Sequence, residues 1–461
     1  MARCVALMTA FLLVLAGVTV DLSLDIPWLD QQRFGQVAVL VLVVIVWLMY
    51  PQVGTGILRR MPVSVRVGLV GFLGLGLLST LLAPLWEWAL LEWSMFLLLV
   101  ALSLLLAGIW VSGGRPLNCW LAALLVSVAA VVVVKVMTGY VAALVEGVRL
   151  DTLLLFEGTF SNRRFFGQIA TLFIPIFAWR VGLANRYLAV WWALLVLWWM
   201  LALVSGTRGT WLALGVAHAF LWAGLGRHVW PYMRIQGLGL GLGLLAYGVL
   251  FYAVPAWMGI ETGVENRLDR HFAGLSQRET IWALAWQYTW TNPWLGIGPM
   301  HFAAYPNPVA AHPHNALLQL AAEWGIPAML VAMGVVLYGL VAFAKPLWRE
   351  VDPLRLALLI ALLGAGVQSM VDGVIVIPYT QTWLAILAGW ALGLHFKDYS
   401  LGERPAGILV TTGVRLVMLL AMAGLLWGVW PEILNRPEAT ATYLEQHDSL
   451  SPRYWAQGWI P

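Results

Sequence analysis

The residues best suited to chemistry in this chain lie between His312 and Pro327, where a polar segment interrupts long apolar runs. Pro313 fixes its own φ and favours an extended His312, which predicts that a helix begins at Pro313 and that His314 lies in its first turn. The positive end of that helix disfavours an imidazolium, so we expect His314 to stay neutral and able to accept a proton. His314 is therefore the candidate general base.

Asn315 and Glu323 lie on a polar face of the same predicted helix, eight residues apart. Gly325 is expected to end the helix. We expect Asn315 and Glu323 to position the helix rather than to react. His312, which is held extended before the helix, has no comparable setting and is not a candidate base.

Three arginines upstream of this helix are candidates for holding an anion. Arg208 lies in a tight external turn, Ser-Gly-Thr-Arg-Gly-Thr, whose backbone N–H groups could join it on phosphate oxygens. Arg164 follows a second arginine in an external loop, where the pair could hold an anionic headgroup or a diphosphate. Arg278 lies in the first turn of a helix that Ser276 can cap, where its charge is poorly matched to the helix dipole. Each arginine has a simpler interpretation as a solvated or lipid-anchoring charge.

Few other charges lie within the apolar runs. Asp372 could orient His314 or assist an acceptor hydroxyl, and otherwise is an acid at the water boundary. Lys135 marks a substrate path or extends to the interface, and Arg415 is expected to extend to it. No external cluster of Asp, Glu, His or Cys has divalent-metal spacing, so we predict no metal and no cofactor.

The composition decides the protein class. Of 461 residues, 61% are hydrophobic and 10% are charged, and the mean hydropathy is +0.84. In a soluble chain about a quarter of the residues are charged. We therefore predict an all-α, polytopic membrane protein, and its net charge of +4 does not indicate a nucleic-acid partner.

Apolar runs long enough to cross about 30 Å of hydrocarbon recur along the chain, and we count about thirteen. The predicted spans are 4–20, 34–50, 67–84, 93–112, 119–138, 168–184, 187–204, 210–226, 235–258, 327–344, 356–376, 380–395 and 408–430. Placing Arg3 in the cytoplasm puts 14 basic and 4 acidic residues on that side, as the positive-inside rule favours. The histidine segment then faces the periplasm.

These spans divide the chain into four predicted parts. Residues 1–258 hold nine transmembrane helices, with external loops at 139–167 and 205–210. Residues 259–326 form a long periplasmic loop and the histidine helix, residues 327–430 hold four more transmembrane helices, and residues 431–461 form a short periplasmic tail.

The motifs around Arg208, Arg278 and His314 together resemble the O-antigen ligase superfamily, which includes O-antigen polymerases and bacterial O-oligosaccharyltransferases that act on pilin-like proteins. The Ser-Gly-Thr-Arg-Gly-Thr-Trp-Leu-Ala-Leu run is similar to the first arginine motif of that family. The Ser-Gln-Arg-Glu-Thr-Ile-Trp run, followed by Asn292 to Pro299, is similar to its long-loop motif. His314-Asn315, with Gly325 further on, resembles its histidine motif, although Ala328 departs from the usual pattern.

The resemblance implies metal-independent transfer of a glycan from undecaprenyl diphosphate, on the periplasmic side of the bacterial inner membrane. His314 would act as the base, while Arg208, Arg278 and Arg164 would hold the diphosphate. The segment Glu323-Trp-Gly and the final run Pro-Arg-Tyr-Trp-Ala-Gln look closer to the protein-directed branch of the superfamily, which implies an acceptor protein, a pilin serine or threonine. Lipid A-core and a growing polysaccharide stay open as acceptors, and a lipid-linked glycan transporter stays open as a different class.

Overall fold

The computed structural model describes residues 26–113, 115–152, 154–156, 160–183, 186–263, 277–305, 307–397, 407–446 and 451–460. Within these ranges the chain is helical, and the isolated bridge there joins Leu150 and Thr262. The predicted first span, 4–20, lies outside the described residues. The expectation of an all-helical chain is confirmed for the rest.

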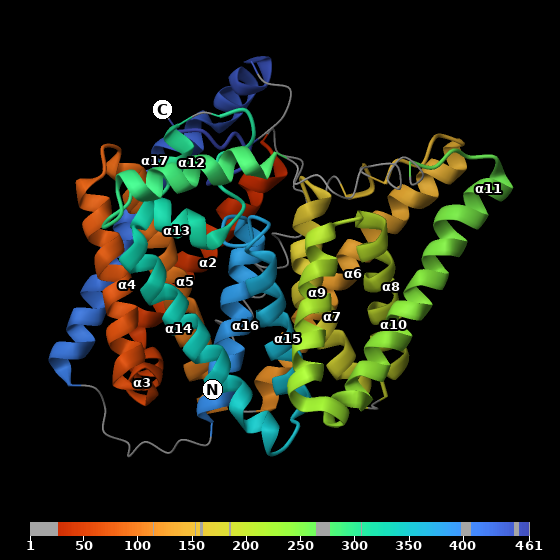
Figure 1. Cartoon of the computed structure of the whole chain (residues 1–461), viewed down its shortest axis with the longest axis horizontal. Coiled ribbons are helices and arrows are strands. Elements are labelled where there is room, and N and C mark those ends of the chain that lie inside the picture. The colour runs from red at the N-terminus through yellow and green to blue at the C-terminus, as the bar shows by residue number, and fades with distance from the viewer. Residues whose placement is uncertain are drawn as a thin grey trace.

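The elements of the first half build one bundle, which the longer helices cross back and forth (Figure 1). They are α2 (Trp28–Met49), α3 (Pro51–Arg60), α4 (Val63–Leu82), α5 (Trp86–Gly113), α6 (Arg115–Glu146), η1 (Leu154–Phe156), α7 (Arg163–Gly182), α8 (Leu188–Ser205), α9 (Arg208–Leu225), η2 (Gly226–Val229) and α10 (Trp230–Gly248).

The second half adds further helices to the bundle and two short helices, α12 and α13, across one of its ends (Figure 1). The elements are η3 (Val249–Ala253), α11 (Val254–Met258), α12 (Arg278–Thr291), η5 (His301–Ala304), α13 (Ala316–Trp324), α14 (Ile326–Ala344), η6 (Lys345–Trp348), α15 (Pro353–Gln368), α16 (Pro378–Phe396) and α17 (Ile408–Gln446).

Nine helical segments among the described residues are long and apolar enough to cross a membrane, and one of them, Arg208–Met258, contains both α9 and α10. Every predicted span from residue 34 onward overlaps a helix. The protein is thus a polytopic membrane protein, and the count of thirteen stays a prediction.

Two predicted spans have different lengths in the structure. The span at 356–376 ends as a helix at Gln368, because the residues after it turn away to hold the histidine segment. The span at 408–430 continues as α17 to Gln446. The region after residue 430 therefore begins as a helix, where the sequence predicts a short tail.

The buried centre of the bundle is built from α5, α7, α15 and α16. Residues of α7 are almost all buried, and its Phe173 lies between Trp198 and Trp383, with ring centroids 5.2 and 4.6 Å away. This tightly packed aromatic core fixes the positions of the ends of the helices that build it.

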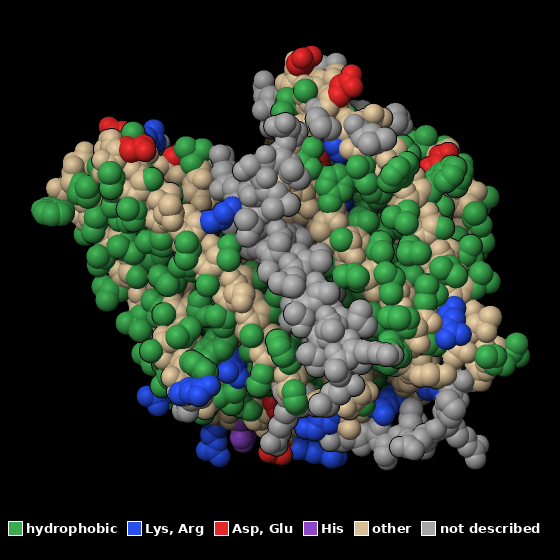
Figure 2. All heavy atoms as spheres, turned by 180° about the vertical axis from the view of Figure 1, so that it is seen from behind, with side chains coloured by type: hydrophobic (Ala, Val, Ile, Leu, Met, Phe, Trp, Pro, Cys, Tyr) green, Lys and Arg blue, Asp and Glu red, His purple; other side chains and the backbone are tan. Residues whose placement is uncertain are grey.

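The two ends of the bundle differ in charge. Lys and Arg side chains gather along the lower edge of the molecule (Figure 2), the edge at which α3 and the turn between α9 and α10 lie in Figure 1. A broad hydrophobic band lies above that edge (Figure 2). This arrangement is the one that the positive-inside rule describes for a membrane protein, and α12 and α13 lie at the opposite end.

Candidate active site

His314 lies just before a helix and not within it. The N-cap of α13 is Asn315, whose side-chain oxygen accepts a hydrogen bond from the Leu318 N–H at 3.0 Å. The φ of His314 is 53°, in the left-handed region. The predicted helix start at Pro313 is therefore wrong, because the helix begins after Asn315, whose side chain accepts a first-turn N–H.

The histidine segment is held from both sides. The Asn315 side-chain amide donates to the Met370 carbonyl at 3.1 Å, and the Ala316 N–H donates to the Ser369 carbonyl at 2.8 Å. On the other side, the Trp282 indole of α12 donates to the Pro313 carbonyl at 3.0 Å. These bonds fix the unusual backbone of His314, which would otherwise cost free energy.

The His314 imidazole is neutral in this environment. Its pKa is lowered to about 3, first by burial and then by the positive charges of Arg278 and Arg164. Its Nδ1 atom is buried and has no hydrogen-bond partner among the described residues. A neutral imidazole can accept a proton, as the sequence predicts. The cause of its neutrality differs from the predicted one: it is burial and the nearby arginines, and not a position in the first turn of a helix.

The three predicted arginines all begin helices. Arg164 is the second residue of α7, Arg208 is the first of α9, and Arg278 is the first of α12. The pKa of Arg278 is lowered by burial and by the charges of Arg164 and Arg208, while Asp372 opposes the shift. The structure thus places Arg164 and Arg208 near Arg278, and it places Arg278 and Arg164 near His314.

The arginine cluster, Arg164, Arg208 and Arg278, concentrates positive charge in one place. Like charges repel, and each of these arginines also opposes the dipole of its own helix. The Nε atom of Arg278 is buried without a hydrogen-bond partner among the described residues. An anion with several oxygens would relieve both costs, because guanidinium groups and helix N-termini both bind phosphate oxygens.

The starts of α7 and α9 are packed tightly enough to fix this cluster. The Thr207 hydroxyl donates to the Arg163 carbonyl at 3.4 Å. A Cβ on Gly167 would lie 2.9 Å from the Thr207 methyl group, so the close approach requires glycine there. The predicted cap of α12, Ser276, lies outside the described residues, and the N-cap that the structure gives this helix is Gln277, with φ at 60°.

Asp372 lies buried in the loop after α15. Its carboxylate accepts hydrogen bonds from the Gly373 N–H at 2.8 Å and from the Gln368 amide at 3.4 Å. Among the described residues no hydrogen bond joins it to His314. Its charge acts on Arg278 instead, so the geometry favours a role in balancing the arginine cluster.

His312 is the neighbour that the sequence argument missed. Its ring centroid lies 4.1 Å from that of His314, with an angle of 73° between the planes. Its Nδ1 atom lies 2.9 Å from the Pro452 carbonyl oxygen, so Nδ1 carries the proton, since a carbonyl only accepts. The His-Pro-His spacing is the sequence signal for a contact between the two rings. It indicates that contact only when His314 adopts a left-handed backbone.

Glu323 is fully buried at the other end of α13. Its carboxylate accepts a hydrogen bond from the Phe302 N–H at 3.0 Å and forms an ion pair with Arg453 at 2.6 Å. Burial raises the pKa of Glu323, against the opposing charge of Arg453. All of these contacts are within the chain.

The turn from Asn292 to Pro299 holds the end of α13. The Ile297 N–H donates to the Ala322 carbonyl at 2.8 Å, and the Gly298 N–H donates to the Glu323 carbonyl at 3.0 Å. Next to it, the Trp324 ring stacks on Phe72 of α4 with centroids 4.8 Å apart. The long-loop motif therefore supplies the donors for carbonyl groups that a helix end leaves unpaired.

Within the described residues, no group of three or more His, Cys, Asp or Glu side chains is arranged to hold a metal ion. The site consists of a neutral imidazole, three arginines and one buried carboxylate. Such a set can accept one proton and stabilise a multiply charged anion.

Comparison with known proteins gives one family match. Residues 192–333 match the family model described as O-antigen ligase. The match spans the segments that carry Arg208, Arg278 and His314, whereas Arg164 and Asp372 lie outside it. It confirms the resemblance drawn from the three motifs. A search of curated proteins found no match.

Proposed function

We propose that this chain, a relative of the O-antigen ligases through residues 192–333, transfers a glycan from undecaprenyl diphosphate to a hydroxyl group of an acceptor protein such as pilin. Transfer would take place on the periplasmic side of the bacterial inner membrane and would use no cofactor. The observation that carries the proposal is the neutral His314 beside Arg278 and Arg164, with a buried Arg278 Nε that has no hydrogen-bond partner among the described residues.

The reaction would be a direct displacement at the anomeric carbon. The acceptor oxygen forms a bond to that carbon while the bond from the carbon to the phosphate oxygen breaks. His314 takes the proton of the acceptor hydroxyl, and the arginine cluster holds the negative charge of the departing diphosphate. A positioned base is commonly worth about 10²- to 10⁴-fold in rate, and charge stabilisation of a leaving group can equal it.

The location of the site supports a periplasmic reaction. His314 and Arg278 lie on the α12 and α13 side of the bundle, at the end opposite the edge where Lys and Arg side chains gather (Figures 1 and 2). Basic residues favour the cytoplasmic side of a bacterial membrane. The donor would approach from the outer half of the bilayer.

The choice of a protein acceptor rests on the resemblance of the sequence to the protein-directed branch. The residues that carry it, Trp324, Tyr454 and Trp455, are buried and so do not touch an acceptor themselves. The family description, O-antigen ligase, favours lipid A-core as the second candidate. The two acceptors have to be compared directly.

The decisive experiment uses the full chain in lipid nanodiscs with undecaprenyl-diphosphate glycan. Pilin and lipid A-core are offered separately, and product mass is measured. We expect glycan on pilin, and its loss in His314→Ala but not in His228→Ala, a histidine in the turn between α9 and α10. Product on lipid A-core alone would overturn the acceptor. An unchanged rate in His314→Ala at normal protein level would overturn the mechanism.

A further inference from the structure

The strap, residues 451–460, is buried although it follows the end of α17. Arg453, Tyr454 and Trp455 each expose 3% or less of their surface. A segment that lies outside the helices at the margin of a fold is usually exposed to solvent. The burial of these residues means that the bundle leaves a site for them in contact with the histidine segment.

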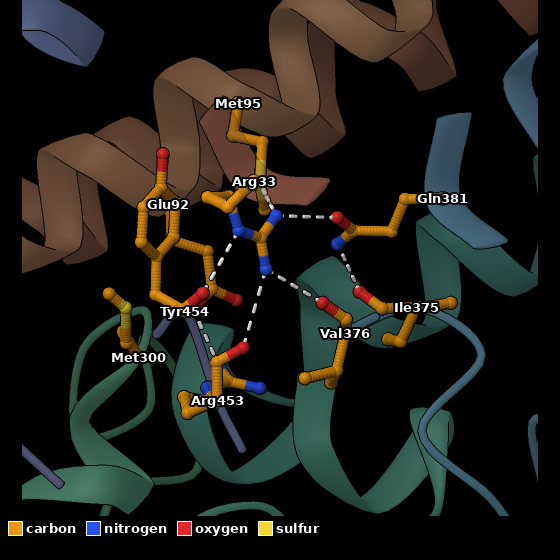
Figure 3. Close-up of a pocket in the computed structure, with 9 residues that line it drawn as sticks. All are labelled: Arg33, Glu92, Met95, Met300, Ile375, Val376, Gln381, Arg453 and Tyr454. Carbon is orange, nitrogen blue, oxygen red and sulfur yellow. Dashed lines mark hydrogen bonds and ion pairs between the residues drawn. The ribbon is translucent and has the colours of Figure 1, made fainter. Parts of the chain in front are cut away.

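The strap is anchored in the transmembrane bundle. The buried Arg33 of α2 donates to the Tyr454 carbonyl at 2.9 Å and to the Arg453 carbonyl at 3.3 Å (Figure 3). On the same helix, Asp30 accepts a hydrogen bond from the Ala456 N–H at 2.7 Å. Two charged side chains of one buried helix therefore fix the strap backbone.

The strap holds both ends of the histidine segment, residues 312–323. At one end, the Pro452 carbonyl bonds to the His312 ring and thereby sets its tautomer beside His314. At the other end, Arg453 pairs with Glu323 at 2.6 Å. The Ile460 N–H also donates to the Ala303 carbonyl at 3.1 Å. Ala303 follows Phe302, whose N–H donates to the Glu323 carboxylate.

One nitrogen of Arg453 links the bundle to α13. The same Nη2 atom lies 2.6 Å from Glu92 of α5 and 2.6 Å from Glu323. Figure 3 shows Arg453, Glu92 and Arg33 gathered with Val376 and Gln381, which flank the start of α16. Removing the charge of Arg453 leaves two buried carboxylates that share no cation, and they repel each other.

We propose that the strap positions the histidine segment for catalysis, with Arg453 as its positioning residue. Arg453 itself touches no reacting atom; it acts by holding Glu323 while Pro452 holds His312. The kinetic part of this inference rests on the proposed glycan transfer. A displacement of catalytic groups by about 1 Å can cost about a hundredfold in rate, so the strap would affect turnover more than donor binding.

Substitutions at two positions, Arg453 and Gly458, perturb the strap by independent routes. Arg453→Met removes the charge, and Arg453→Lys keeps it, because both contacts come from one nitrogen that an ammonium group can replace. Gly458→Ala leaves every charge in place. Gly458 has φ at 85°, and a Cβ there would overlap the Ser451 carbonyl and lie 3.0 Å from Ala311, next to His312.

The controls are matched in type and lie at a distance. Arg415→Met removes a half-buried arginine that donates to the Leu48 carbonyl. Gly413→Ala adds a Cβ where no atom lies within 4 Å. Neither residue contacts the strap or the histidine segment in the described part of the chain.

The test measures hydrogen exchange and kinetics on the full chain in nanodiscs. Arg453→Met and Gly458→Ala should raise exchange in residues 312–324 by about tenfold, with other helices unchanged. They should lower kcat by about a hundredfold while the KM for the donor stays within about twofold. Arg453→Lys should retain more kcat than Arg453→Met, and both controls should behave as the unmutated chain.

Other results would overturn the proposal. Unchanged kcat per folded molecule in Gly458→Ala, or faster exchange spread over the whole bundle, would reduce the strap to a general stabilising element. If the unmutated chain transfers no glycan, the proposed function fails, yet the exchange data still decide whether the strap holds residues 312–324. If Arg453→Met does not accumulate in membranes, Gly458→Ala decides the question alone.

Discussion

The imidazole ring of His312 lies edge-on to that of His314, with ring centroids 4.1 Å apart and planes at 73°. His312 is buried, and the Pro452 carbonyl fixes its Nδ1 as a donor. Its Nε2 atom is buried without a hydrogen-bond partner among the described residues. His312 therefore forms one wall of the space in which the His314 ring sits.

We expect His312→Ala to lower the rate of glycan transfer by about ten- to a hundredfold, because the His314 ring loses its neighbour and gains freedom to turn away. The loss should be smaller than for His314→Ala, which removes the base itself. Initial rates of both variants at equal protein level check this order. A His312→Ala rate equal to that of the unmutated chain would show that the ring contact has no role.

The pH dependence of transfer should change when the donor binds. In the free protein the pKa of His314 is about 3, and Arg278 and Arg164 contribute to lowering it. The negative charges of a bound diphosphate offset those arginines, so the pKa rises in the complex. We expect the acid limb of kcat, which reports the complex, at a higher pH than the acid limb of kcat/KM, which reports the free enzyme. Coincident limbs would contradict this coupling.

Arg278→Gln should weaken both donor binding and transfer. Loss of one charged donor to the diphosphate is expected to lower kcat/KM by about 10²- to 10³-fold, and loss of a nearby positive charge should raise the pKa of His314. The kcat/KM of Arg278→Lys should fall between those of the unmutated chain and Arg278→Gln, because lysine keeps the charge but lacks the planar guanidinium group. Kinetics with varied donor concentration and pH measure both effects. Arg227→Gln, in the turn after α9, is the control and should change neither.

Gly296→Ala should release the end of α13. Gly296 has φ at 68°, and a Cβ there would overlap the backbone of Glu323. The strain is expected to cost about 1 to 3 kcal/mol, lowering the thermal unfolding midpoint in detergent and the transfer rate together. Gly334→Ala in α14 adds a Cβ with no atom within 4 Å and should leave both unchanged. An unaltered midpoint in Gly296→Ala would contradict the docking of this turn on α13.

The sequence by itself determined the class of the protein and most of its helices. Long apolar runs are a local property that the thickness of a bilayer selects, so each predicted span from residue 34 onward overlaps a helix. The same holds for the motifs around Arg208, Arg278 and His314, because they are short and contiguous. Their resemblance to O-antigen ligases was visible without a structure and is confirmed by the family match.

Tertiary structure alone decided how these motifs meet. The Asn315 amide donates to the Met370 carbonyl, fifty-five residues away, and this bond holds the start of α13, with His314 outside the helix. The neutrality of His314 comes from burial beside Arg278 and Arg164, and the strap reaches it through Pro452 and Arg453. Spacing within a segment fixes which face a side chain takes on its own helix. Contacts between distant segments depend on how the whole chain packs, and no local pattern records them.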